Sequence, residues 1–431
     1  MLIVRKTDRL EGTVKAPPSK SYTHRAVIGA SLADGVSRII NPLWGADCLS
    51  SVHGCRMLGA NIELEKEKDE WIVKGGELKT PDNIIDIGNS GTTLRILTSI
   101  ASQIPKGYAI LTGDDSIRKR PMQPLLDALK QLNIEAFSSK LDGTAPIIVK
   151  SGKIKGNKVK IRGDISSQFI TSLMMLLPFN EEDTEIILTS PLKSKPYIDV
   201  TLDILNTFGI KIDKTDNGFL VYGNQKYKAI DYIVEGDYSS ASYLIAAGVL
   251  INSNIIIENL FANSKQGDKA IIDIVKEMGA DVKVKKDKVI IEGNYNLEGI
   301  DVDVKDIPDL VPTIAVLGCF ADGKTEIYNG EHVRLKECDR LRACAIELKK
   351  MGADIKEKPD GLIIRGVKKL KGAKLNTYHD HRLVMAFTVA GLKAEGETII
   401  EGEEAVKISF PNFVDVMKSL GANIEKVEQL K

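Results

Sequence analysis

Several segments place basic and hydroxyl side chains where a helix is expected to begin. KAPPSKSYTHR, residues 15–25, has two prolines, then Ser19 as a helix cap, and then Lys20, Ser21 and Arg25. The free amides and positive dipole of a helix start, together with two cations, suit a phosphate or carboxylate. An ordinary capped surface helix is the alternative for this segment taken alone.

A second segment, DIGNSGTTLR at residues 86–95, predicts a strand, a glycine-containing turn and a helix that carries Arg95 in its first turns. Gly91 would let a ligand come close to the backbone. The segment lacks the GK[ST] of a Walker loop and is not GxGxxG. Downstream, Arg118, Lys119 and Arg120 precede a helix begun by proline, and such a basic run is usually just solvated.

Neutral hydrogen-bonding groups follow in two further segments. GDISSQF places Ser166, Ser167 and Gln168 at a helix start, and SKPYID offers Ser194 and Tyr197 beside a proline-fixed turn. Such groups suit hydroxyls or a phosphate, although a plain capping role is a strong alternative for the serines.

The second half of the chain supplies groups that can move protons. KDIPDLVPTIAVLGCF predicts an apolar helix with Asp309 in its first turn, where a carboxylate also favours the helix dipole. EHVRLKECDRLRACAIELKKMGA predicts one continuous helix. On it Lys336 and Arg340, four residues apart, share a face beside Glu337. A charged solvent-facing side of that helix is the alternative.

YHDHRLVMAF leads His381 and Arg382 into another apolar helix. His379 and His381 are too few ligands for a metal site. Cations thus recur near expected helix starts, where the dipole favours anions instead. A substrate pair with several phosphate or carboxylate groups would resolve that mismatch. The cations concerned are Lys20, Arg25, Arg95, Arg120 and Arg382.

These segments lie on a unit that recurs six times along the chain. In each copy a helix-like run ends at a glycine or asparagine, and two short strand-like runs follow. The turn residues are Gly59, Asn133, Gly209, Gly279, Gly352 and Gly421, at steps of 74, 76, 70, 73 and 69 residues. Such regular spacing predicts a repeat architecture of mixed α/β units, each ending in a hairpin.

Six units divide into two domains of three, with the midpoint near residues 231–238. We expect one domain at residues 16–234 and a second formed by residues 1–15 together with 235–431. Residues 1–15 look like a strand, and we expect them to pair with the second half. A cleft between two similar domains is the expected ligand site.

Composition excludes several classes of function. The chain has 59 basic residues (Lys and Arg together) and 59 acidic residues (Asp and Glu together), so its net charge is zero. It therefore has no general affinity for nucleic acid or acidic membranes. No apolar run approaches the roughly 20 residues that span a bilayer, and no signal peptide opens the chain. The five cysteines form no CxxC pair, which argues against a zinc site or a disulfide framework and favours a reducing cytoplasm.

The order of these motifs resembles the EPSP synthase family of enolpyruvyl transferases over nearly the whole chain. The matching segments are KSYTHR, GNSGTTLR, RKRP, SSQF, SKPYID, IPD, LKECDR and HDHR. The resemblance implies two domains, each of three βαβαββ units forming an inside-out α/β barrel, joined by two crossover strands. It implies transfer of the enolpyruvyl group of phosphoenolpyruvate to the 5-hydroxyl of shikimate 3-phosphate, a step toward the aromatic amino acids.

The same resemblance implies roles for individual residues. Shikimate 3-phosphate would contact Lys20, Ser21, Arg25, Ser166, Ser167, Gln168, Ser194, Tyr197, Asp309 and Lys336. Phosphoenolpyruvate would contact Lys20, Gly91, Arg120, Gln168, Arg340, Arg382 and Lys407. The catalytic groups would be Asp309 as the base, assisted by Lys336, Glu337 as the acid that protonates the enol methylene, and Lys20. The first domain would bind mainly shikimate 3-phosphate, and the second would supply acid, base and phosphoenolpyruvate groups. No cofactor or metal is implied, and we expect a cytoplasmic monomer.

Two positions depart from the family pattern. The family often has lysine two residues before a Phe-Pro pair, whereas in VKISFP Lys407 stands three before Phe410. Cys338 in LKECDR replaces a common threonine, and we expect this small residue to be a neutral replacement.

Three rival interpretations remain. The sister enzyme that acts on UDP-N-acetylglucosamine usually has Lys-Asn in place of Lys20-Ser21, and a loop with Cys or Asp; residues 114–120 here lack Cys. An RNA-end-modifying enzyme built from similar units is disfavoured, because a chain with zero net charge has no general affinity for RNA. A pure anion-binding module would not need Asp309, Lys336 and Glu337 together.

Overall fold

The computed structural model describes residues 1–427, and contacts between residues divide the chain into two compact domains. The first, here called the continuous domain, comprises Pro18–Val234. The second, the split domain, comprises Met1–Pro17 together with Glu235–Lys431. The chain therefore enters the continuous domain after Pro17, two residues later than expected, and leaves it after Val234.

Each domain holds three four-stranded sheets. In the continuous domain the strands are β3 (Gly35–Ile40), β4 (Asn61–Glu65), β5 (Glu70–Gly75), β6 (Ile85–Asp86), β7 (Tyr108–Thr112), β8 (Ala136–Ser138), β9 (Ile147–Lys150), β10 (Lys158–Ile161), β11 (Thr184–Leu188), β12 (Ile212–Thr215), β13 (Gly218–Val221) and β14 (Asp231–Ile233). In the split domain they are β1 (Leu2–Arg5), β2 (Arg9–Lys15), β15 (Asn252–Glu258), β16 (Val282–Val284), β17 (Lys288–Gly293), β18 (Asp301–Asp303), β19 (Lys324–Tyr328), β20 (Asp354–Lys358), β21 (Gly361–Arg365), β22 (Lys374–Leu375), β23 (Glu397–Ile400) and β24 (Ile424–Lys426).

Every sheet repeats one pattern. Two neighbouring strands pair in parallel, and two antiparallel strands complete the sheet, as in the order β6-β7-β9-β8. Parallel neighbours need a crossover connection, and in four of the six sheets one buried helix supplies it. The structure thus has the expected βαβαββ units, three in each domain.

The first helix of each unit is buried on nearly all sides. These first helices are α1 (Lys20–Leu32), α3 (Gly91–Ile100), α5 (Ser167–Leu176), α7 (Tyr238–Leu250), α9 (Val311–Phe320) and α11 (His381–Lys393). In the split domain α7, α9 and α11 pack against one another. Helices inside and sheets outside agree with the inside-out barrel that the motifs imply.

The second helix of each unit lies before the terminal hairpin. These helices are α2 (Ala46–Met57), α4 (Gln123–Gln131), α6 (Lys195–Thr207), α8 (Ile271–Glu277), α10 (Arg340–Lys350) and α12 (Phe413–Ser419). All six end in the same left-handed turn, with φ from +60° at Asn133 to +115° at Gly59.

In α2 the amide of Ala60 reaches the carbonyl of Cys55, and that of Gly59 reaches Arg56. This paired Schellman arrangement recurs at the end of each of the six helices. The spacing of glycine and asparagine in the sequence therefore predicted the helix ends correctly.

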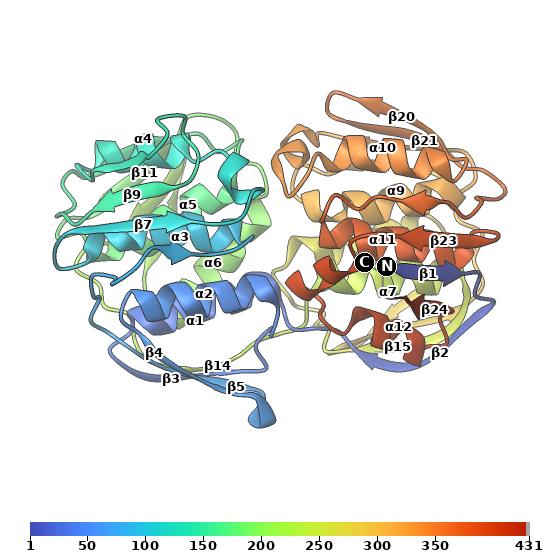
Figure 1. Ribbon diagram of the computed structural model, residues 1–431, viewed down its shortest axis with the longest axis horizontal. Coiled ribbons are helices and arrows are strands. Elements are labelled where there is room, and N and C mark those ends of the chain that lie inside the picture. The colour runs from blue at the N-terminus through green and yellow to red at the C-terminus, as the bar shows by residue number, and fades with distance from the viewer. Residues whose placement is uncertain (428–431) are drawn as a thin grey trace. The chain divides into compact units, whose positions relative to one another are not determined.

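The first residues of the chain do pair with the second half, but they form two strands. β1 lies between β23 and β24, and β2 runs parallel to β15 (Figure 1). β1 and β24 thus complete the last unit as β5 and β4 complete the first. Leu2, Val4 and Leu10 are fully buried, which ties these strands to the core of the split domain.

One helix prediction is wrong. Residues 331–350 do not form a single helix, because η7 (Glu331–Leu335) is a 3-10 turn and α10 begins only at Arg340. Asp339 caps α10 by accepting from the amide of Arg342 at 3.0 Å, and Arg334 binds Asp339 at 2.7 Å. Lys336 lies in an extended conformation before the cap, so it shares no helix face with Arg340.

Within residues 1–427 no helix combines the length and the apolar character needed to cross a membrane. All five cysteines are free thiols, and four of them are buried.

Candidate active site

Arg25 is a buried cation held by neutral groups alone. Its guanidinium donates to Thr201 Oγ1 at 2.8 Å and to the carbonyl of Ser21 at 2.9 Å. A longer contact of 3.4 Å reaches the carbonyl of Tyr197, so Arg25 joins α1 to α6. Among the described residues it forms no ion pair. Burial lowers the pKa of Arg25 to about 10, which still leaves it charged at neutral pH. A buried cation without a counter-ion is costly, and a bound anion would offset that cost.

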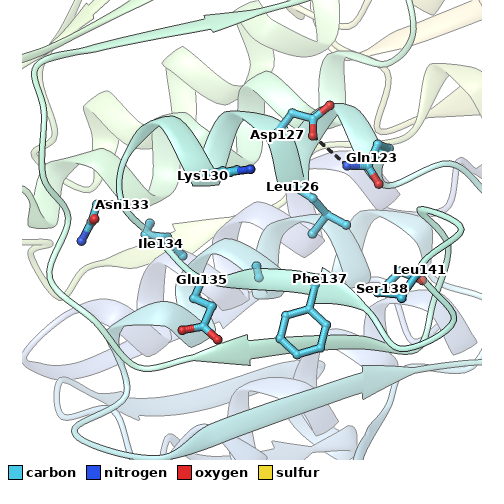
Figure 2. Close-up of a pocket in the computed structure, with 11 residues that line it drawn as sticks. Gln123, Leu126, Asp127, Lys130, Asn133, Ile134, Glu135, Phe137, Ser138 and Leu141 are labelled. Carbon is cyan, nitrogen blue, oxygen red and sulfur yellow. Dashed lines mark hydrogen bonds between the residues drawn. The ribbon is translucent and has the colours of Figure 1, made fainter.

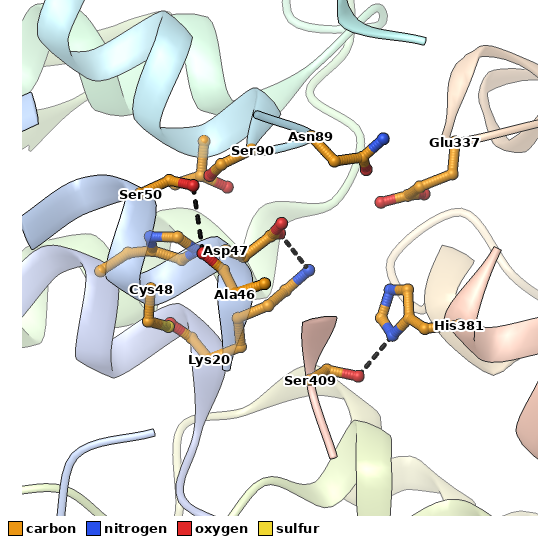
Figure 3. Close-up of polar contacts among 12 residues, drawn as sticks. Lys20, Ala46, Asp47, Cys48, Ser50, Asn89, Ser90, Glu337, His381 and Ser409 are labelled. Carbon is orange, nitrogen blue, oxygen red and sulfur yellow. Dashed lines mark hydrogen bonds and ion pairs between the residues drawn. The ribbon is translucent and has the colours of Figure 1, made fainter. Parts of the chain in front are cut away.

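Lys20 opens the same helix, and its ammonium lies 3.1 Å from Asp47 Oδ2 at the start of α2 (Figure 3). Both side chains are largely buried. Asp47 is not among the predicted site residues, because its sequence carries no signal beyond an acidic residue in a first helical turn. The pair fixes the Lys20 ammonium beside the N-terminus of α1.

Gly91, the first residue of α3, lies in a narrow space lined by polar groups. A Cβ atom at this position would stand 2.9 Å from Arg120 Nη1, 3.7 Å from Arg95 Nη1 and 3.8 Å from Gln168 Oε1. Gln168 accepts from Arg95 at 2.6 Å and donates to Thr92 at 3.0 Å. The structure thus brings together three residues expected to bind one ligand, namely Gly91, Arg120 and Gln168.

Arg120 stands before α4, and Asn89 and Ser116 hold its guanidinium. Its Nη2 donates to Asn89 Oδ1 at 3.2 Å and to Ser116 Oγ at 3.1 Å. Asn89 belongs to the turn that precedes Gly91. The basic run that looked like a solvated segment therefore points Arg120, which is only 7% exposed, toward the start of α3.

The serines lie where their helices begin. Ser166 caps α5 by accepting from the amide of Gln168 at 3.3 Å, and Ser167 is the first residue of that helix. Ser194 precedes α6 with a left-handed φ of +56°. Arg25 contacts Thr171 of α5 at 3.5 Å as well as α6, so it links the helices that carry all of these serines.

In the split domain, Arg340 gathers three carboxylates. Its Nε donates to Asp380 at 2.7 Å, Nη1 donates to Asp309 at 2.8 Å, and Nη2 contacts Glu337. Arg340 is 1% exposed. Burial alone would lower its pKa, but the charges of Asp380, Glu337 and Asp309 raise that pKa well above its ordinary value. We call this group, with Arg382, the carboxylate–arginine cluster.

Asp309 is the centre of this cluster because both of its oxygens are engaged. Oδ1 meets Arg340, and Oδ2 accepts from Arg382 at 2.8 Å. Lys336 lies 3.9 Å from Oδ1. The structure therefore brings together Asp309, Lys336, Glu337, Arg340 and Arg382, although the predicted helix face that was to unite three of them does not exist.

Asp380 was missed although it stands in the HDHR motif. It caps α11 by accepting from the amide of Arg382 at 2.9 Å, and it also binds Arg340. The Cys338 thiol contacts Asp380 Oδ2 at 3.5 Å. Burial, and then the charge of Asp380, raises the pKa of Cys338 far above its usual value, so this thiol stays protonated. A threonine hydroxyl could make the same contact, which supports the expectation of a neutral replacement.

Asp268 is a second missed carboxyl. It lies in η5 (Gly267–Ala270), is 3% exposed, and accepts from Ser239 Oγ at 2.5 Å. Burial raises the pKa of Asp268 to about 7, and the negative charge of Asp309 adds to that rise while Arg382 opposes it. No sequence motif marks this residue.

Lys407 does not join the cluster. It lies in η8 (Glu403–Ile408), its side chain is exposed, and it forms no ion pair with any residue of 1–427. Two residues later, Ser409 is hydrogen-bonded to Nδ1 of His381, which is buried at the start of α11 (Figure 3). The role implied for Lys407 stays a prediction.

The buried helices of the two domains differ in their caps. Ser19, Ser90 and Ser166 cap α1, α3 and α5, whereas Asp237 and Asp380 cap α7 and α11. Neutral caps leave the positive helix ends uncompensated, while aspartates neutralise them. The continuous domain is therefore suited to receive anions, and the split domain carries ionisable acids suited to proton transfer.

One groove lies away from all of these groups. It has a volume of about 590 Å³ and is lined by residues of α4, of β8 and of the turns beside β8, among them Leu126, Phe137 and Leu141 (Figure 2). None of the predicted site residues lines it. Among the described residues no three His, Cys, Asp or Glu side chains are arranged to hold a metal ion.

Comparisons with known proteins identify the family of the chain. The sequence profile described as EPSP synthase (3-phosphoshikimate 1-carboxyvinyltransferase) matches residues 4–417. A 3-phosphoshikimate 1-carboxyvinyltransferase of Methanocaldococcus jannaschii is 95% identical over 425 residues, covering 99% of each chain. One of Methanococcus maripaludis strain C6 is 70% identical over 99% of this chain and 100% of its own length.

Among solved structures, an EPSP synthase of Acinetobacter baumannii is similar with a TM-score of 0.84. The two sequences are 27% identical, and the match covers 99% of this chain and 100% of that one. A profile match over most of the chain and relatives at this identity leave a single assignment. The chain belongs to the EPSP synthase (3-phosphoshikimate 1-carboxyvinyltransferase) family.

Proposed function

We propose that the protein transfers the enolpyruvyl group of phosphoenolpyruvate to the 5-hydroxyl of shikimate 3-phosphate, releasing phosphate. The observation that carries this proposal is that Asp309 and Glu337 contact different nitrogens of one buried guanidinium, that of Arg340. A reaction that adds a hydroxyl across a carbon–carbon double bond needs a base and an acid held in fixed relation.

The atoms balance in two steps. First, the hydroxyl oxygen bonds to C2 of phosphoenolpyruvate, its proton passes to Asp309, and C3 gains a proton from Glu337. In the tetrahedral intermediate the bond from C2 to the phosphate oxygen then breaks, a proton of the C3 methyl group returns to Glu337, and the proton held by Asp309 passes to the departing phosphate. The products are the enol ether and inorganic phosphate. Cations stabilise the charge that builds on the leaving phosphate.

We assign the phosphate of shikimate 3-phosphate to Arg25, Ser166 and Ser167, with the other serines and Tyr197 beside its ring. Arg25 supports this assignment because its protein partners are all neutral. Lys20, Ser21, Ser194 and Gln168 complete the groups of the continuous domain that we assign to shikimate 3-phosphate.

We assign phosphoenolpyruvate to Lys20, Gly91, Arg120 and Gln168, with Arg340, Arg382 and Lys407. All three nitrogens of Arg340 already contact carboxylates. A substrate carboxylate would therefore have to displace one of them. Asp309 and Glu337 are exposed at 13% and 12% of their side chains, whereas Asp380 is fully buried, so one of the first two would give way. The split domain also supplies Asp309 and Lys336.

The direct test is phosphate release from purified protein given phosphoenolpyruvate and shikimate 3-phosphate. The matched reaction replaces the second substrate with UDP-N-acetylglucosamine. We expect turnover with shikimate 3-phosphate alone. Turnover only with the sugar nucleotide, or with neither acceptor, would refute the proposal. We also propose that the protein acts as a monomer in the cytoplasm, and sedimentation of the purified chain tests its oligomeric state.

A further inference from the structure

A chain of buried hydrogen bonds connects α1 to the cap of α3. His24 Nδ1 lies 2.8 Å from Ser51 Oγ, which lies 2.7 Å from Thr93 Oγ1. Thr93 Oγ1 in turn lies 2.7 Å from Ser90 Oγ, and Ser90 caps α3 immediately before Gly91. All four side chains are fully buried. This series of hydrogen bonds therefore runs from α1 through α2 to the turn that holds Gly91.

The imidazole of His24 is neutral. Burial lowers the pKa of His24 well below its ordinary value, and the neighbouring charges of Lys20 and Arg25 lower it further. A neutral imidazole has one N–H donor and one acceptor nitrogen. Which nitrogen carries the proton decides the direction of every bond along the chain.

The surroundings of the ring favour the proton on Nδ1. Nε2 is buried and has no hydrogen-bond partner among residues 1–427. A proton on Nε2 would leave a buried donor unsatisfied, whereas a proton on Nδ1 is donated to Ser51. Ser51 then donates to Thr93, and Thr93 donates to Ser90.

Ser90 Oγ thus accepts from the hydroxyl of Thr93 and also from the Thr93 amide at 3.3 Å. Two accepted hydrogen bonds fix the orientation of this cap, and with it the peptide that joins Ser90 to Gly91. Gly91 is the first residue of α3, and the Arg120 and Gln168 side chains lie close to its Cα.

We propose that His24 is a positioning residue, which acts through Ser51, Thr93 and Ser90 to hold the Gly91 turn ready for phosphoenolpyruvate. The proposal rests on the proposed function of that turn. It predicts a selective effect, because Arg25 is held by Thr201 and Ser21, outside the hydroxyl chain. Loss of these hydrogen bonds should weaken the binding of phosphoenolpyruvate and leave the binding of shikimate 3-phosphate unchanged.

The test uses two matched pairs of variants in the full-length protein. His24→Leu and Thr93→Val each break the chain with little change in volume. His24→Asn and Thr93→Ser keep a donor or a hydroxyl in place. We expect the first pair to raise the KM for phosphoenolpyruvate about five- to tenfold, the effect of losing one hydrogen bond, with the KM for shikimate 3-phosphate unchanged. The second pair should stay close to the wild type.

A double variant sharpens the test. If both residues act through one chain, His24→Leu with Thr93→Val should be no worse than either single change. Additive effects, an unchanged KM for phosphoenolpyruvate, or equal rises in both KM values would overturn the proposal. Thermal melts identify variants that do not fold. Should His24→Leu be one of them, Ser51→Ala, which removes a single oxygen atom, carries the same expectation.

Gly91→Ala separates this proposal from the function on which it rests. The added Cβ would meet Arg120 Nη1 at 2.9 Å, so we expect a higher KM for phosphoenolpyruvate. If that variant binds phosphoenolpyruvate normally, the assignment of the turn fails. If it binds poorly while the chain variants bind normally, the role of His24 alone fails.

Discussion

At the scale of single residues, Arg340 positions the proposed base and acid of the split domain. Its guanidinium is almost completely buried, yet it contacts three carboxylates, and two of them are the proposed base and acid. A buried ion group of this kind is stable only if each charge keeps its partners. The same contacts that satisfy Arg340 therefore fix Asp309 and Glu337 relative to each other.

Neutral isosteres should separate proton transfer from binding. We expect Asp309→Asn and Glu337→Gln each to lower kcat by about 100- to 10,000-fold, the usual contribution of a general acid or base. Binding of shikimate 3-phosphate, measured by calorimetry, should change little. Glu357→Gln, which alters a partly exposed carboxylate bound to Arg334, is the control and should keep normal turnover. Near-normal kcat in both active-site variants would contradict the assigned roles.

Asp268 predicts a pH dependence of stability. Its pKa is raised to about 7 in the folded protein, first by burial and then by Asp309, whereas an unfolded aspartate titrates near 4. The folded state thus favours the protonated form, and the resulting stabilisation is complete below about pH 4 and is lost as pH rises through 7.

The Asp268→Asn side chain cannot ionise. The unfolding free energy of this variant minus that of the wild type should therefore be larger at pH 8 than at pH 5. Urea titrations at the two pH values measure that difference. An identical difference at both would show that Asp268 does not titrate in this range.

At the scale of elements, the helix-ending turns were predictable and the start of α10 was not. A turn with positive φ favours glycine or asparagine, so the local sequence predicts its position. The break before Arg340 depends instead on Arg334, which reaches Asp339 and Glu357 at 2.7 Å. The partnership of Lys20 with Asp47 likewise depends on how α1 packs against α2, and residue types alone do not reveal that packing.

The six turns allow backbone strain to be separated from steric contact. Gly352 has φ +93° and open space around a Cβ atom, whereas at Gly59 a Cβ would lie 2.9 Å from the carbonyl oxygen of Glu77. We expect Gly352→Ala to cost about 1 kcal/mol of unfolding free energy, from the left-handed conformation alone. Gly59→Ala should cost clearly more. Chemical denaturation measures both, and equal losses would show that the contact with Glu77 relaxes freely.

At the scale of the whole molecule, each domain contains one strand that directly precedes the first helix of the other domain in the sequence. β2 precedes α1 of the continuous domain but pairs with β15 of the split domain. β14 precedes α7 of the split domain but pairs with β3 of the continuous domain. As a result, residues 18–234 contain every strand of their three sheets, whereas residues 235–431 lack both β1 and β2.

The two parts should therefore behave differently when expressed alone. We expect a fragment of residues 18–234 to fold and to melt cooperatively, since its core and sheets are complete. A fragment of residues 235–431 should stay unfolded until a peptide of residues 1–17 is added. Circular dichroism and thermal melts report both results. Cooperative melting of the second fragment without the peptide would contradict the expectation.

The position of β1 also has a consequence for synthesis on the ribosome. Leu2 and Val4 leave the ribosome long before their sheet partner β23, which begins only at residue 397. At about 5–20 residues per second, this apolar strand waits roughly 20 to 80 seconds for its neighbour. The continuous domain can meanwhile fold as it leaves the exit tunnel. The nascent chain must therefore keep β1 from pairing with other polypeptides until β23 has been synthesised.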